Sequence, residues 1–196
     1  MLFRSDPKKF LGNLFFAFLG ADKVVAPKVV GAYVGGFGTA PGLKTKQANA
    51  YRAVMKKYYP KLPPDDGFVY NYYNAAWALV QGLNKSHGAV GAKLQSSLPR
   101  TLRPGYQVSG HGVLHLDKNR QAIQDQWPLQ IVSKGGKPAL TVVGFVPNVT
   151  QSFGGLFKKS SPPPGRTQPP CRKLKTPWQG KIRVVKNGVV TKGVIK

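Results

Sequence analysis

The chain has 196 residues, which fits one ordinary domain or parts of two, and 41% of the residues are hydrophobic. That fraction supports a packed core and excludes a wholly disordered chain. Thirty Lys and Arg residues against six Asp and no Glu give a net charge of +24, and the lack of Glu excludes any site built on it. Such a charge attracts polyanions such as nucleic acid, anionic lipid or wall polymers, but it is also what a basic proteome or a basic fragment would give. The single cysteine, Cys171, cannot form an internal disulfide.

The N-terminal segment contains an apolar run from Phe10 to Leu19. This run is shorter than the roughly 18 residues that span a bilayer, and a glycine and an asparagine interrupt it. Asp6 and Pro7 precede it, an order that is typical of a helix start and not of a signal peptide. We therefore expect a helix that ends at Gly20, and we expect any export signal to lie outside this chain.

Two long helices are predicted in the first half of the chain. The β-rich segment 29–36 indicates a buried strand that enters a loop, and the helix pattern of 44–59 then ends before Pro60. A Pro/Asp/Gly break separates it from the second helix, at 68–83. The apolar stripe of the first helix is expected to comprise Ala48, Tyr51, Val54, Met55 and Tyr58, and that of the second Val69, Tyr72, Tyr73, Ala76, Val80 and Leu83.

Shorter elements follow. A helix is expected over 89–98, closed by Pro99, and a short strand over 112–116. Strands over 128–133 and 139–146 are joined by Lys-Gly-Gly-Lys, a hairpin signal.

The C-terminal part changes in composition. Five prolines between Ser160 and Pro170 predict an extended linker, and residues 157–196 carry eleven positive charges and no negative one. The pattern of residues 181–191 predicts a small hairpin with its turn at Asn187-Gly188. This hairpin needs a docking surface, because an isolated hairpin is only marginally stable in water. We expect this tail to project from the body or lie loosely on it.

Catalytic and metal-binding patterns are absent from the sequence. It has neither a phosphate-binding loop nor a dinucleotide fingerprint. His111 and His115 lie four apart around a predicted strand, with no Cys or Glu nearby, so no metal site is predicted. We expect no catalytic residues, no cofactor and no enzymatic activity.

Tyrosines are concentrated at the start of the second long helix. Tyr70, Tyr72 and Tyr73 cannot all share one stripe, because neighbours on a helix differ by about 100°. An aromatic residue at a helix N-terminus can line a ligand cleft or simply pack in the core.

The order of the elements resembles a known family. Residues 68–83 (FVYNYYNAAWALVQGL), a second short helix, Val113-Leu-His-Leu-Asp117, Trp127-Pro-Leu-Gln-Ile-Val132 and the Lys-Gly-Gly-Lys turn resemble the C-terminal part of type I periplasmic binding proteins. The branch most similar is that of the branched-chain amino acid receptors of ABC importers. Upstream, Val29 to Val34 and Tyr51 to Pro60 also look like this family. The resemblance covers roughly residues 1–156.

The resemblance implies an α/β chain, an incomplete two-lobed fold with Rossmann-like parallel sheets and a basic C-terminal tail. The family's N-terminal half would be missing, as in a truncated product or a gene fragment. The implied divisions are a second-lobe portion (1–62), a first-lobe portion (68–116), a return to the second lobe (128–147), a Pro-rich basic linker (157–178) and a basic tail with a β-hairpin (179–196).

By this resemblance, Tyr73 lines the ligand cleft, with Tyr70 and Phe3 as weaker candidates. One departure from the family concerns the acidic residue of the second lobe that pairs with the ammonium group of an amino-acid ligand. The matching region, 24–38, has no Asp or Glu. Either a segment is missing there or the ligand is not an α-amino acid. The carboxylate-binding groups of the first lobe would also be absent, so weak or no binding is expected from this chain alone.

The main functional hypothesis is a ligand-binding component of an ABC importer, for branched-chain amino acids or similar small solutes. Its partners would be the ligand and a membrane permease, and its location periplasmic or at the cell surface, as part of a longer exported protein. The tail would contact an anionic surface of the envelope or pack on the missing lobe, with Cys171 bonded to a cysteine upstream. The alternative hypothesis is a basic nucleic-acid-binding protein that uses its Lys/Arg-rich surface and tail.

Overall fold

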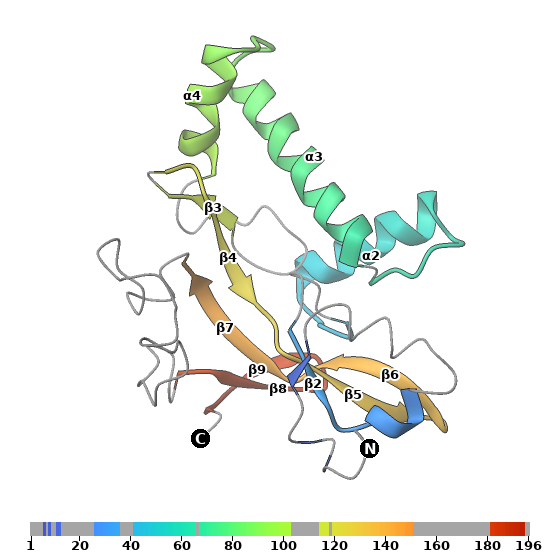
Figure 1. The fold of residues 1–196 in the computed structure, drawn as a ribbon. Coiled ribbons are helices and arrows are strands. Elements are labelled where there is room, and N and C mark those ends of the chain that lie inside the picture. The colour runs from blue at the N-terminus through green and yellow to red at the C-terminus, as the bar shows by residue number, and fades with distance from the viewer. Residues whose placement is uncertain are drawn as a thin grey trace, which may run out of the picture.

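The structure is a computed structural model that describes residues 6, 8, 11–12, 26–35, 41–65, 67–102, 114–117, 119–150 and 181–194. Within these ranges, three α-helices form an arm that extends from two β-sheets (Figure 1). The helices are α2 (Lys46–Tyr58), α3 (Gly67–Lys85) and α4 (Ala92–Thr101), and a 3-10 helix covers Ala26–Val29. The strands are β1 (Leu11–Gly12), β2 (Tyr33–Val34), β3 (Leu114–Leu116), β4 (Ala122–Gln126), β5 (Leu129–Lys134), β6 (Lys137–Val142), β7 (Gly144–Val149), β8 (Arg183–Lys186) and β9 (Val189–Val194). No helix in the described ranges is both long enough and apolar enough to span a membrane.

Helix α2 follows its sequence pattern closely. The Thr45 hydroxyl caps its N-terminus by accepting a hydrogen bond from the Ala48 backbone N–H at 3.1 Å. The stripe residues Ala48, Tyr51 and Met55 are buried as expected. Tyr58 was expected in the same stripe but is 61% exposed, because the helix ends there and its last turn extends beyond the packed body.

Helix α3 was predicted at the correct place but with the wrong buried face. Tyr72 is 77% exposed and Val80 51% exposed, whereas Tyr70 and Asn74 are almost completely buried. The face that packs includes Gly82, where an added Cβ would lie 2.6 Å from Leu98 Cδ2 of α4. A glycine at the helix crossing contributes nothing to an apolar stripe, so a hydrophobic pattern cannot identify this face.

Helix α4 is shifted relative to the prediction of 89–98. It begins at Ala92, after Gly91, and continues past Pro99 to Thr101. The proline was expected to close the helix, but the Leu102 N–H still donates to the Leu98 carbonyl at 2.7 Å. One missing donor in the last turn is therefore tolerated.

The two sheets have the strand orders β1-β2-β5-β6 and β3-β4-β7-β8-β9. The mixed α/β class and the adjacency of β2, β5 and β6 were expected. The expectation of parallel sheets is wrong: among the described pairs only β1–β2 is parallel. The Gly135-Gly136 turn explains this for β5 and β6, because a two-residue turn joins only antiparallel strands and a parallel pair needs a long crossover.

Three strand predictions need correction. The strand expected over 29–36 is, among its described residues 29–35, extended only at Tyr33–Val34, because a turn at Gly31 (φ +102°) follows the 3-10 helix. Leu11–Gly12 is a strand that pairs with β2, so the expected helix does not include these residues, and the rest of 10–19 lies outside the described part of the chain. The expected strand 139–146 is divided at Val143 into β6 and β7, which belong to different sheets.

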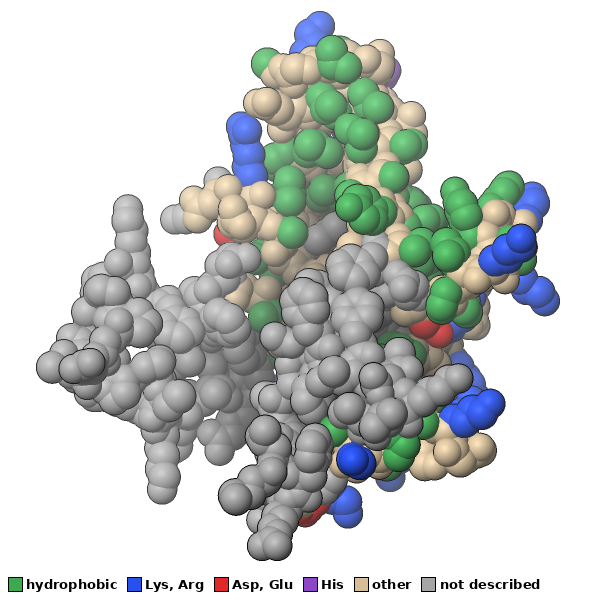
Figure 2. All heavy atoms as spheres, turned by 45° about the vertical axis from the view of Figure 1, so that its right-hand side comes forward, with side chains coloured by type: hydrophobic (Ala, Val, Ile, Leu, Met, Phe, Trp, Pro, Cys, Tyr) green, Lys and Arg blue, Asp and Glu red, His purple; other side chains and the backbone are tan. Residues whose placement is uncertain are grey.

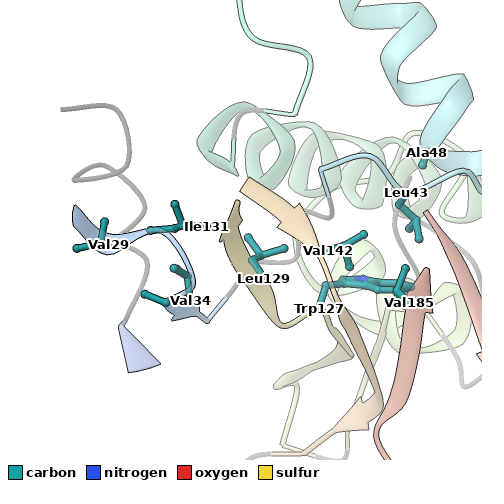
Figure 3. Packing of buried hydrophobic residues seen from close by; sticks show 10 residues of the cluster. Val29, Val34, Leu43, Ala48, Trp127, Leu129, Ile131, Val142 and Val185 are labelled. Carbon is teal, nitrogen blue, oxygen red and sulfur yellow. The ribbon is translucent and has the colours of Figure 1, made fainter. Parts of the chain in front are cut away.

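The main core lies between the sheets and includes the C-terminal hairpin (Figure 3). Its buried members are Val29, Ala32, Val34, Leu43, Ala48, Trp127, Leu129, Ile131, Val142 and Val185. Val185 lies on β8, which pairs with β7, and the Lys44 N–H donates to the Gly188 carbonyl at 2.8 Å. The expectation of a loose or projecting tail is therefore wrong for β8 and β9, while Cys171 and the proline-rich linker lie outside the described residues.

Candidate functional site

Three tyrosines meet where α2 and α3 pack together. The ring centroid of Tyr51 lies 5.3 Å from that of Tyr70 and 5.0 Å from that of Tyr73, with edge-on geometry in both pairs. Met55 is buried with them and Val69 packs against them. We call Tyr51, Tyr70 and Tyr73 the tyrosine cluster. Edge-to-face packing adds roughly 0.5–1.5 kcal/mol per pair to the burial of the rings, which fixes their orientation.

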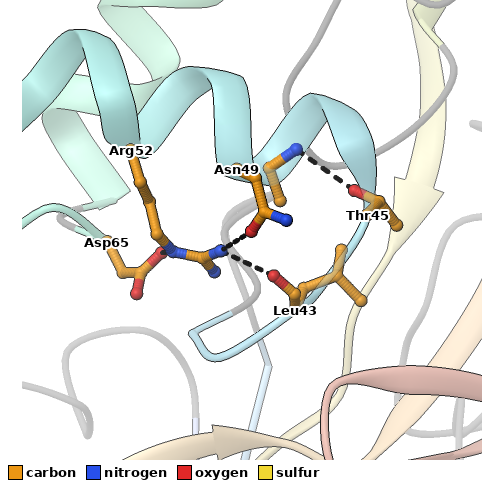
Figure 4. A network of polar contacts seen from close by, with 6 residues as sticks. Leu43, Thr45, Asn49, Arg52 and Asp65 are labelled. Atoms are coloured by element: carbon orange, nitrogen blue, oxygen red, sulfur yellow. Dashed lines mark hydrogen bonds and ion pairs between the residues drawn. The ribbon is translucent and has the colours of Figure 1, made fainter.

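A polar network at Arg52 fixes the connection between the two helices (Figure 4). Its Nε donates to Asp65 Oδ1 at 3.0 Å, and Nη1 donates to the Leu43 carbonyl at 2.6 Å and to Asn49 Oδ1 at 3.3 Å. Arg52, in the middle of α2, thus holds Leu43, which precedes the helix, and Asp65, which follows it. It therefore determines where the chain enters α3, one turn before Tyr70.

The residues that were predicted to bind ligand differ in how accessible they are. Tyr70 is only 1% exposed, so it supports the cluster from within and is closed off from solvent. Tyr73 is half-buried and remains accessible at one side of the cluster. Phe3 lies outside the described residues. A ligand-contacting role for each of the three stays a prediction.

Sequence reasoning missed Tyr51 and Asn74 as members of this region. Asn74 follows Tyr70 by one helical turn and is 6% exposed, and its Oδ1 atom has no hydrogen-bond partner within the described structure. A buried acceptor of this kind costs roughly 1–3 kcal/mol when it is unsatisfied. The signal in the sequence was a polar residue four positions after a tyrosine that packs inward. That signal can be interpreted only once the buried face of α3 is known.

The described residues offer no metal-binding constellation. They contain no group of three or more His, Cys, Asp or Glu side chains that is close enough to hold an ion. His115 lies half-buried on β3, and His111 is outside the described ranges. The surface that the tyrosine cluster offers to a partner is the accessible part of Tyr73, which provides an aromatic contact.

Among known proteins, the chain has similarity to a solved structure but not to a family model or a curated protein. No family model matches the chain, and no curated protein matches it either. One solved structure is similar to it: the solute-binding protein of an ABC transporter from R. palustris, in complex with benzoate. The sequences are 20% identical, the TM-score is 0.47, and the match covers 63% of this chain and 32% of that one. The chain thus corresponds to about a third of that protein's length.

Proposed function

We propose that the chain is the C-terminal part of the solute-binding component of an ABC importer. The order of elements supports this: two long helices at 46–58 and 67–85, followed by the β5–β6 hairpin, match the order of the resemblance described above. In this proposal, residues 1–62 and 128–147 belong to one lobe and 68–116 to the other. The partner is a membrane permease, and the location is the periplasm or the cell surface.

The observation that carries the binding role is the position of Tyr73. Its ring packs against Tyr51 and is partly exposed, in the N-terminal part of α3, where the resemblance puts the cleft. Apolar side chains exposed along α3, seen in green in Figure 2, offer further surface that the other parts of a two-lobed protein would cover. The ligand would stack on the accessible part of the Tyr73 ring.

The proposed class of ligand comes from the resemblance, and the charges near the expected cleft modify it. Branched-chain amino acids are the first class to test. The described segment 26–35 has no acidic side chain to pair with an ammonium group. We therefore propose a branched-chain carboxylate, whether it is the amino acid or an analogue without the ammonium group.

Saturation-transfer NMR on the purified chain tests this proposal, because it detects millimolar binding. The panel comprises leucine, isoleucine, valine and their 2-oxo acids, which lack the ammonium group. We expect saturation of the branched methyl groups, and we expect its loss in Tyr73→Ala and its retention in Tyr72→Ala, which removes a tyrosine that is 77% exposed on the same helix. In a longer protein that includes both lobes, Tyr73→Ala should weaken binding by about 1–3 kcal/mol. Equal signals above background from the wild type and Tyr73→Ala would remove Tyr73 from the site.

A further inference from the structure

A second surface, separate from the tyrosine cluster, lies at the C-terminal end of α2. There the sequence Lys56-Lys-Tyr-Tyr-Pro-Lys-Leu62 presents three exposed lysines and two exposed tyrosines. Tyr58 is 61% exposed and Tyr59 54% exposed, and Leu62 is 45% exposed beside them. We call Lys56, Lys57, Tyr58, Tyr59 and Lys61 the α2-end patch. Figure 2 shows blue Lys and Arg side chains beside green hydrophobic ones at its right-hand edge, over this part of the molecule.

The patch has a defined shape. The Tyr59 N–H caps the helix by donating to the Met55 carbonyl at 2.8 Å, and the Leu62 N–H donates to the Tyr59 carbonyl at 3.0 Å. Beyond this turn, the ion pair of Asp65 with Arg52 ties the chain back to α2. The two tyrosines are therefore held on an ordered turn and are not part of a loose loop.

The patch is also strongly and uniformly positive. The segment 44–62 contains six basic residues and no acidic one. The Lys57 ammonium lies 4.8 Å from the centroid of the Tyr58 ring, a cation–π contact. Lysines in the last turn of a helix favour its dipole, which accounts for Lys56 and Lys57. The dipole accounts neither for Lys61, which lies beyond the helix, nor for two adjacent exposed tyrosines.

We propose that the α2-end patch binds single-stranded nucleic acid. Exposed aromatic rings provide flat surfaces on which unpaired bases stack, and the ammonium groups beside them contact the phosphates. The positive charge makes this surface unfavourable for docking on another basic face, including a second copy of a chain of charge +24. Each exposed ring offers a separate surface on which a base can stack, whereas insertion into a bilayer requires a broad apolar helix face.

Fluorescence anisotropy with a labelled oligothymidylate of about 20 nucleotides at roughly 50 mM salt tests the proposal on the full chain. Tyr58→Ala/Tyr59→Ala should weaken binding by about tenfold, because stacking contributes roughly 1–3 kcal/mol per base. Tyr72→Ala is the control, because Tyr72 is even more exposed, at 77%, but lies on a helix that has no basic residue before Lys85. It should change affinity less than about twofold.

The lysines are tested in the same way. Lys56→Gln/Lys57→Gln/Lys61→Gln should weaken binding about tenfold and lower the slope of log K against log salt by about 2. The control is Lys93→Gln/Lys134→Gln/Lys137→Gln, which removes three exposed lysines elsewhere and so matches the change in net charge. Circular dichroism checks that every variant folds.

Three results would overturn the proposal. The first is equal loss of affinity in the two lysine variants together with no effect of the tyrosine pair, which means that binding follows net charge alone. The second is binding to inorganic polyphosphate with the same dependence on the tyrosines, since polyphosphate has no bases to stack. The third is tyrosine-dependent binding to vesicles containing phosphatidylserine without binding to the oligonucleotide. Since these probes differ from the small ligands tested above, failure here leaves the proposed function untouched.

Discussion

Replacing Gly188 with alanine should detach the C-terminal hairpin from the body. Gly188 is the second residue of the β8–β9 turn, and its φ of +78° follows a φ of +50° at Asn187, the pattern of a type I′ turn. It is buried, and an added Cβ would overlap the carbonyl oxygen of Gly42 and lie 3.0 Å from Lys44 Cγ. Backbone oxygen cannot move aside as a flexible side chain can, so the hairpin must move.

The cost has three parts. Left-handed backbone at a non-glycine residue costs about 1–2 kcal/mol. Displacing the turn breaks the hydrogen bond from the Lys44 N–H to the Gly188 carbonyl, worth about 1 kcal/mol. It also partly exposes Val185, whose full burial contributes about 1.5–3 kcal/mol. We expect a total loss of about 3–5 kcal/mol from the free energy of unfolding.

Gly136→Ala is the matched control. Gly136 is the second residue of the β5–β6 turn, and its φ of +74° is nearly that of Gly188, but an added Cβ there meets nothing within 4 Å. This variant should lose only the backbone part, about 1–2 kcal/mol. Urea unfolding followed by tryptophan fluorescence measures both, since Trp127 belongs to the same core as Val185. Equal destabilisation by the two alanines would refute the docking of the turn on Gly42.

Two further predictions concern stability. Val185→Ala should lower the free energy of unfolding by about 2 kcal/mol, because it removes buried methyl groups from the core. Val194→Ala, on the exposed end of β9, should cost less than about 0.5 kcal/mol. Similar urea midpoints for the two variants would contradict the burial of β8. Asp65→Asn should cost about 1 kcal/mol by removing the ion pair with Arg52, and the difference from wild type in thermal unfolding should shrink at about 1 M salt. A difference that is independent of salt would mean that the loss does not come from the charge of Asp65.

Local signals in the sequence predicted the helices and the turns well. Pro60 ends α2 and the Pro/Asp/Gly break precedes α3, because proline geometry acts within a few residues. The glycine-rich turns at 135–136 and 187–188 likewise mark the two hairpins. The relative direction of the strands was predicted wrongly, because the parallel arrangement was inferred from the resemblance and not from the hairpin turns.

The buried face of α3 could not be predicted from the residues of α3 alone. Tyr70, Tyr72 and Tyr73 are the same residue type on the same helix, so only their positions distinguish them. Periodicity alone assigned Tyr72 to the core and left Tyr70 as a candidate for the cleft. The partners decide the matter: Tyr51 packs against Tyr70 and Tyr73, and the approach of α4 at Gly82 fixes the face of α3 that is buried. Both contacts join residues that lie at least twelve positions apart.

The sequence by itself determined the positive charge, the lack of Glu, the two long helices, the two hairpin turns and the mixed α/β class, because composition and short-range geometry are written in neighbouring residues. Only the tertiary structure decided which face of α3 is buried, that residues 139–149 divide between two sheets, and that the basic hairpin at 183–194 packs on the core through Val185. These outcomes depend on contacts between distant segments, where burial and close packing outweigh the preference of any single element.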